Sequence, residues 1–224
     1  MNLATLDPII REKSIVSFAG ELERAKAIGA EYLVLHPGNY RGQTAAEGIA
    51  AFVLGMAEAA QTVDCPGLTV LIENTVGAGC QIGSTFLELR MIRDLAQGET
   101  SLPIGYCLDT CHMFAAGFNI ATPRGLQETL SQAGEVLGLE HVHVIHANDS
   151  RGMLGSRLDR HANIGEGQIG EDGFRGILTH PALRTKAFIL ETPVDEEGDD
   201  LRNVNTLKRL SQITKKRKSE LTNA

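Results

Sequence analysis

Histidine and carboxylate side chains gather between residues 143 and 167, and their types are those of a divalent-metal site. A short apolar run ends at His146, and the loop that follows carries Asp159-Arg160-His161. Alternate residues of an extended segment point to the same side, so Asp159 and His161 can chelate one ion. Imidazole with carboxylate suits zinc or manganese better than calcium. Taken alone, the stretch also fits polar loop residues that only form turns.

The elements that must position these residues alternate along the chain. Apolar runs without polar alternation predict five buried strands, which helical segments separate, and this order is typical of an α/β fold with a parallel sheet. The strands are expected at residues 32–35, 68–72, 104–108, 142–145 and 188–190. The helices are expected at residues 11–29, 44–62, 84–96, 123–137, 171–179 and 200–214.

A potential metal ligand stands at the end of each expected strand: His36, Glu73, Asp109, His146 and Glu191. They follow one another at intervals of 37, 36, 37 and 45 residues, a nearly constant step that corresponds to one strand-helix unit. In a (β/α) barrel the carboxyl ends of the strands face one common mouth, where catalytic groups lie. One polar residue at a strand end is ordinary, but five in register indicate a shared site.

Three further groups lie beyond strand ends, which makes eight candidate ligands: His36, Glu73, Asp109, His112, His146, Asp159, His161 and Glu191. A catalytic zinc takes about three protein ligands, so eight groups suit two or three ions, with a carboxylate such as Glu73 bridging. Clustered divalent ions are a device for phosphodiester hydrolysis, which then requires no serine or cysteine nucleophile.

Composition narrows the classes of function. The chain of 224 residues has a net charge of −7, so it lacks an overall basic footprint for nucleic acid, although bound cations can reverse the charge at a site. No apolar run reaches the roughly 20 residues that span a bilayer, and the start does not have the pattern of a signal peptide. The four cysteines show no paired spacing, which favours reduced thiols in the cytoplasm.

Six segments resemble those of endonuclease IV, the zinc-dependent family of apurinic/apyrimidinic endonucleases: HPGNY, LIENTVGAG, CLDTCHMFAAGF, HANDS, GSRLDRHANIGEGQIG and ILETP. The resemblance runs from about Arg11 to about residue 210. It implies a TIM barrel with three zinc ions that cuts double-stranded DNA on the 5′ side of an abasic site and leaves a 3′-hydroxyl.

For individual residues, the resemblance implies a division of the ligands among three zinc ions. The first ion takes His36 and Glu73, and Glu73 bridges to the second ion. The second ion also takes Asp109, His146 and Glu191. The third takes His112, Asp159 and His161. Glu73 and Glu191 then stand as the catalytic carboxylates, and Arg160 as a contact to a DNA phosphate. His141, His143 and His180 match no ligand position. Cys107 and Cys111 fit buried thiols better than a redox pair.

The sequence departs from the family at its beginning, because the family has eight strands and this chain shows the last five. Three units correspond to about 90 residues of a typical barrel. We therefore expect residues 1–214 to form one incomplete TIM barrel, followed by a polar basic tail at 215–224. A further histidine of the first zinc would be missing, so fewer than three ions, self-association through unpaired strand edges and little activity are expected, whereas the full-length form would be a monomer.

Two other functions remain open. One is a sugar isomerase or epimerase of the xylose-isomerase-like barrel type, which uses a strand-end Glu, Asp, His and Glu set around one ion. His112, Asp159 and His161 form a ligand set for a further ion. An isomerase does not need this set, so its presence distinguishes the two functions. The other is a truncated remnant that binds zinc or DNA without catalysis.

Overall fold

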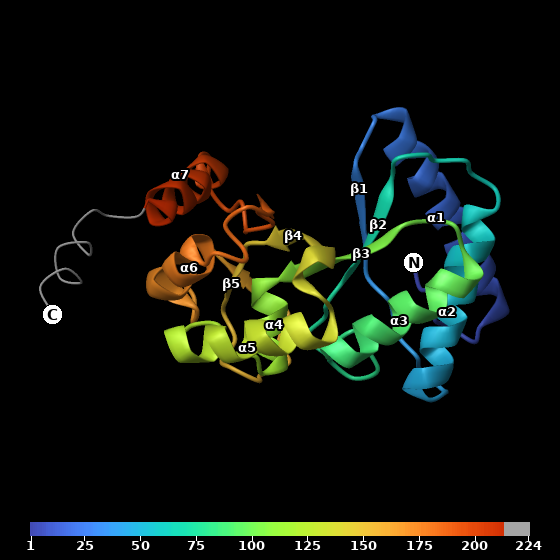
Figure 1. Ribbon diagram of the computed structural model, residues 1–224, viewed down its shortest axis with the longest axis horizontal. Coiled ribbons are helices and arrows are strands. Elements are labelled where there is room, and N and C mark those ends of the chain that lie inside the picture. The colour runs from blue at the N-terminus through green and yellow to red at the C-terminus, as the bar shows by residue number, and fades with distance from the viewer. Residues whose placement is uncertain (213–224) are drawn as a thin grey trace, which may run out of the picture.

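The computed structural model describes residues 1–212, in which five parallel strands form one curved sheet with the helices outside it (Figure 1). The strands pair in the order β1-β2-β3-β4-β7, so β1 and β7 each have one neighbour. Their bounds are β1 (Tyr32–Leu35), β2 (Thr69–Glu73), β3 (Ile104–Asp109), β4 (Val142–His146) and β7 (Ala187–Ile189). All five expected strands are confirmed to within one residue at each end, as is the incomplete barrel. The expected tail at 215–224 lies outside the described residues.

Seven α-helices occur in the described residues, and each outer helix packs against the next one along the sheet. The predicted helices are confirmed with ends that shift by up to three residues, whereas the sequence analysis missed the short helix α4 and the 3₁₀ turn η1. The bounds are α1 (Pro8–Ala27), α2 (Ala45–Ala60), α3 (Phe86–Glu99), α4 (Thr110–Ala116), α5 (Pro123–Val136), η1 (Leu139–His141), α6 (Gly170–Thr179) and α7 (Asp199–Ser211).

Local side-chain chemistry explains where several helices begin. The Asp7 carboxylate accepts hydrogen bonds from the first turn of α1, and Pro8 occupies the first helical position, where no amide hydrogen is needed. Helix α2 begins with a capping box, in which Thr44 and Glu47 bond to each other's backbone amides. Helix α4 was missed because it begins directly at the end of β3, with Asp109 as its N-cap, and has only seven residues.

The sheet curves strongly, as one contact across its inner face demonstrates. Tyr32 in β1 stacks on His143 in β4, with ring centroids 5.2 Å apart. In a flat sheet these strands would be about 14 Å apart, because three strand spacings separate them. The inner face is closed by a small apolar cluster of Leu71, Cys107 and Val144, whereas the main core lies between the sheet and the helices. This curvature brings the carboxyl ends of all five strands to one rim.

A two-stranded antiparallel hairpin, β5 (Asp149–Ser150) with β6 (His161–Ala162), projects from the rim after β4. The sequence analysis treated this region as a loop. The buried Asp149 carboxylate accepts hydrogen bonds from the backbone amides of Gly165, Gly167, Ile169 and Gly170. The glycine-rich segment after β6 is thereby fixed around Asp149, which places His161 at the rim.

Within residues 1–212, the structure contains no helix with the length and apolar character needed to cross a membrane. All four cysteines are free.

Candidate metal centre

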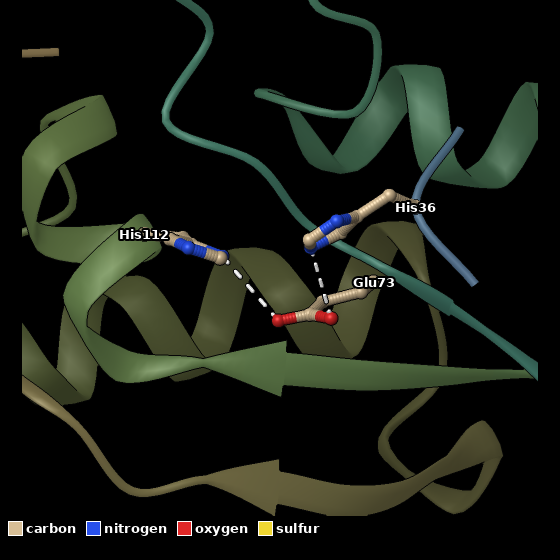
Figure 2. A group of neighbouring side chains, drawn as sticks. All are labelled: His36, Glu73 and His112. Atoms are coloured by element: carbon tan, nitrogen blue, oxygen red, sulfur yellow. Dashed lines mark ion pairs between the residues drawn. The ribbon is translucent and has the colours of Figure 1, made fainter. Parts of the chain in front are cut away.

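The Glu73 carboxylate, at the end of β2, lies at the centre of the rim and is only 3% exposed. Its Oε2 lies 3.0 Å from Nε2 of His36, and its Oε1 lies 3.0 Å from Nδ1 of His146. Figure 2 shows His36 and His112 approaching this carboxylate from different elements, the segment after β1 and helix α4. One buried carboxylate therefore joins imidazoles from three parts of the chain.

A first set of four ligand atoms comes from Glu73, Asp109, His146 and Glu191, which all lie within 4.8 Å of one another. His146 Nδ1 lies 3.1 Å from Glu191 Oε2 and 3.0 Å from Glu73 Oε1. Asp109 is fully buried and Glu191 is about half exposed. We call these four residues the strand-end group, because each lies at or just beyond the end of a strand.

A second set, which we call the hairpin group, consists of His112, Asp159 and His161. Asp159 Oδ1 lies 3.3 Å from Nε2 of His112 and 3.6 Å from Nε2 of His161. Ligand atoms about 2.1 Å from a tetrahedral zinc lie about 3.4 Å from each other, so the spacing fits such an ion. Asp159 and His161 thus lie on one side of the extended segment, as the sequence pattern predicted.

The ring nitrogens of the hairpin group are oriented as in metal ligands. His112 Nδ1 lies 2.9 Å from the Asn74 carbonyl oxygen, and His161 Nδ1 lies 2.9 Å from the Glu191 carbonyl oxygen. Donation from Nδ1 leaves the Nε2 lone pair free for a cation, which is the usual arrangement of metal-binding histidines. Nε2 of His161 is buried without a hydrogen-bond partner in the described residues. These two observations show that the residues fit a divalent metal.

His36, Glu73 and His112 also place ligand atoms within 4.8 Å of one another. Because Nδ1 of His112 donates to Asn74, only its Nε2 can bind a cation, and that atom lies beside Asp159. His112 therefore belongs to the hairpin group, and His36 remains paired with Glu73 alone.

Burial and neighbouring charges shift the pKa values of these side chains in opposite directions. Burial by itself would raise the pKa of Glu73, but hydrogen bonds from three histidines outweigh it and hold that pKa well below its ordinary value. Burial would lower the pKa of His112, yet neighbouring carboxylates, Asp109 foremost, raise it to about 11. Hydrogen bonds also raise the pKa of His146 against the effect of burial. The rim is thus a strongly negative site that holds protons, which cations would displace on binding.

Sequence reasoning missed two asparagines that hold the carboxylates in place. Asn148 is fully buried; its Nδ2 donates to Asp109 Oδ2 at 2.6 Å, and its Oδ1 accepts from the Glu191 amide at 2.8 Å. The Asn74 Oδ1 accepts from the Asp109 amide at 2.7 Å. Their positions in the sequence could have identified them, because Asn74 directly follows Glu73 and Asn148 follows the end of β4 by two residues.

Arg160 is exposed beside the hairpin group, where its Nη1 bonds to the Asp159 carbonyl at 2.9 Å. Burial raises the thiol pKa of Cys107 and of Cys111 to about 11. Cys111 lies near Asp109 and His161, but a protonated thiol is a poor metal ligand, so both cysteines fit buried thiols. His141 and His143 lie at the opposite end of the sheet.

Comparison with known proteins places this arrangement in a family. The sequence matches the family described as "Xylose isomerase-like TIM barrel" over residues 1–213. A protein of Solibacter usitatus named "Probable endonuclease 4" is 65% identical over 211 residues, which are 94% of this chain and 73% of that protein.

Solved structures have the same fold. The crystal structure of endonuclease IV from Thermus thermophilus superimposes with a TM-score of 0.78 at 35% identity, over 93% of this chain and 72% of that one. A D-tagatose 3-epimerase-like protein superimposes with a TM-score of 0.67 at 21% identity, over 94% and 73% of the two chains. The second likeness concerns the fold alone.

Proposed function

We propose that this chain, which belongs to the endonuclease IV family, is a DNA repair enzyme that hydrolyses the phosphodiester on the 5′ side of abasic sites and leaves a 3′-hydroxyl. The proposal includes zinc as the metal, with manganese as the alternative, and double-stranded DNA as the partner. The proposed metal ligands are the eight residues His36, Glu73, Asp109, His112, His146, Asp159, His161 and Glu191.

The observation that carries the proposal is the presence of the hairpin group beside the strand-end group. The strand-end group alone would serve a one-ion sugar epimerase. The hairpin group adds two imidazoles and a carboxylate. The Nε2 atoms of both imidazoles converge on the Asp159 carboxylate. Only a reaction that uses several cations gives this second group a purpose, and phosphodiester hydrolysis is such a reaction.

Zinc ions bound at this rim would activate water and neutralise charge on the phosphate. The chain's own residues would hold the ions and contact the substrate. Glu73 lies between His36 and the other members of the strand-end group, so it could serve two metal positions. Glu191, at the open side, is half exposed and accessible to substrate. The exposed guanidinium of Arg160 offers a charged contact to a phosphate next to the hairpin group.

The test is cleavage of a labelled duplex that contains one abasic site, with the purified chain loaded with zinc. Because little activity is expected of the incomplete barrel, we expect slow cutting: a single cut on the 5′ side of the lesion, a 3′-hydroxyl that a polymerase can extend, and loss of cutting after removal of metal by a chelator. An intact duplex of the same sequence serves as the control substrate.

The competing function is tested with the same preparation by incubation with ketoses. Epimerisation or isomerisation of a ketose, with no cutting of the abasic duplex, would overturn the proposal. Binding of zinc and DNA with neither reaction would leave the chain as a binding protein without catalysis.

A further inference from the structure

We infer that Arg157 is a positioning residue that latches the loop carrying Asp159 to the two other elements around the hairpin group. This loop, residues 151–160, connects β5 to β6. The inference rests on the proposed function insofar as it takes His112, Asp159 and His161 as a metal site. Sequence analysis gave Arg157 no role.

The backbone of the loop caps helix α4, the element that carries His112. The amide of Gly155 donates to the Phe114 carbonyl at 3.0 Å, and the amide of Arg157 donates to the Ala115 carbonyl at 3.0 Å. Carbonyl groups in the last turn of a helix lack partners within the helix, so the loop supplies them. This docking sets the distance between His112 on the helix and Asp159 two residues after Arg157.

The Arg157 side chain ties the same loop to a third element. Its Nη1 donates to the carbonyl oxygens of Val76 and Gly77, at 3.2 and 3.3 Å. Those two carbonyls belong to the segment that follows β2 and its terminal residue Glu73. One arginine therefore joins three parts of the chain that carry metal-type ligands and that are 40 to 80 residues apart in sequence.

The backbone of Arg157 has an unfavourable conformation. In the described residues Arg157 is the one non-glycine residue with a positive φ, at 58°. The left-handed region is unfavourable for residues with a Cβ, and glycine would adopt it without cost. A Cβ at Gly77 would collide with Nη1 of Arg157 and with the Ser84 side chain, and Gly77 also has a positive φ, at 72°. The Arg157 guanidinium therefore packs directly against the Gly77 backbone.

Loss of the latch has a defined consequence. The Asp159 loop would keep its backbone bonds to α4 but lose its attachment to the segment after β2, so Asp159 would be held less rigidly opposite His112. The affinity of the hairpin group for metal would fall, since outer contacts that orient metal ligands typically contribute ten-fold to a hundred-fold in affinity. The strand-end group, which the loop does not contact through Arg157, would be unaffected.

The direction of the change in zinc affinity distinguishes this positioning role from a purely electrostatic effect of the arginine. Removal of a positive charge near a cation site would tighten zinc binding, whereas loss of a latch would weaken it. Arg157→Gly is the informative variant, because glycine accepts the left-handed backbone. Gly77→Ala disturbs the same contact without a change of charge, and its Cβ also crowds the Ser84 side chain. Arg124→Ala is the control, because this arginine is 89% exposed on α5 and its ion pair is with Glu128 in the same helix.

The experiment is titration of zinc into the metal-free full chain and its variants, with a competing chromophoric chelator and without DNA. We expect one class of site to weaken about ten-fold or more in Arg157→Gly and in Gly77→Ala, with no change in Arg124→Ala. The thermal midpoint of the metal-free Arg157→Gly chain should stay within a few degrees of the unmodified chain.

Zinc isotherms identical to that of the unmodified chain would overturn the inference, as would tighter zinc binding by Arg157→Gly. So would unfolding of the metal-free variant, which indicates a purely structural role, or weaker binding of abasic DNA with unchanged zinc affinity, which indicates a direct DNA contact. If the unmodified chain binds no zinc, the proposed function fails as well. If it binds zinc and cuts DNA but the variants match it, only the latch is wrong.

Discussion

The two ends of the curved sheet both carry histidines, yet these side chains are in opposite electrostatic states. At the carboxyl end, His146 lies within 3.1 Å of two carboxylates and its pKa is raised. At the amino end, His143 stacks on Tyr32, and burial together with the charge of Lys186 lowers its pKa. The two histidines belong to the same strand and are three residues apart.

The neighbours account for this difference. At the amino end, Nδ1 of His141 lies 3.3 Å from Nη2 of Arg93, so this ring nitrogen accepts a hydrogen bond from a guanidinium. No buried carboxylate stands opposite these rings in the described residues. At the carboxyl end, Glu73 and Asp109 are both buried and create a negative site. A histidine becomes a candidate metal ligand through the carboxylates that face it and not through its own position in a motif.

The largest expected effect comes from Glu73→Gln, which removes the carboxylate shared by His36 and His146. We expect abasic-site cutting to fall by about three orders of magnitude, roughly 4 kcal/mol of transition-state stabilisation, because one bridging charge is lost. Single-turnover cleavage of an abasic duplex measures it. A variant that cuts at the unmodified rate would show that Glu73 has no catalytic role.

Substitution within the hairpin group should have the next largest effect. Asp159→Ala and His161→Ala should each lower bound zinc by about one ion per chain, because both residues serve one metal position. Metal analysis of the purified variants measures the stoichiometry. His143→Ala, which changes a histidine at the opposite end of the sheet, should retain all of its zinc. Unchanged zinc in the first two variants would return Asp159 and His161 to a role in loop structure alone.

A smaller effect is expected from Asn148→Ala, which removes the amide that orients Asp109 and Glu191. Zinc affinity of the strand-end group should fall about ten-fold, in the range typical of lost contacts behind metal ligands. Zinc titration of the metal-free variant tests this.

A matched control exists in Asn203, another buried asparagine, which bonds to the Ile164 amide, to Asn163 and to the Asp199 carbonyl and not to a candidate metal ligand. Asn203→Ala should lower stability with zinc affinity retained. Equal loss of zinc affinity in both variants would mean that Asn148 acts only through general stability.

The smallest effect concerns the amino end itself. His143→Ala removes the stacking contact with Tyr32, so the free energy of unfolding should fall by about 1 kcal/mol beyond the loss of buried area. His143→Phe, which keeps an aromatic ring, should recover most of that loss. Urea denaturation of the metal-free chains provides the measurement. A large change in zinc binding in either variant would contradict the contrast between the two ends.

The amino-acid sequence by itself determined the strands and most helices, because buried parallel strands appear as short apolar runs and helices as a 3.6-residue period. It also determined the eight candidate ligands, since the constant step from His36 to His146 reflects one strand-helix unit. The segment around Asp159-Arg160-His161 gave the family resemblance that the comparisons then confirmed.

Tertiary structure decided what holds these ligands in place, and it gave the physical basis for the division that the family resemblance implied. His112 joins Asp159 because its Nδ1 donates to Asn74, a residue 38 positions away. Asn148 contacts a carboxylate 39 positions away, and Arg157 reaches a carbonyl 81 positions away. Such contacts exist because parallel pairing sets the ends of β2, β3 and β4 side by side, although these strands are far apart in sequence. Sequence periodicity reports which face of an element is buried, whereas partner choice across the rim depends on how the strands are ordered and paired.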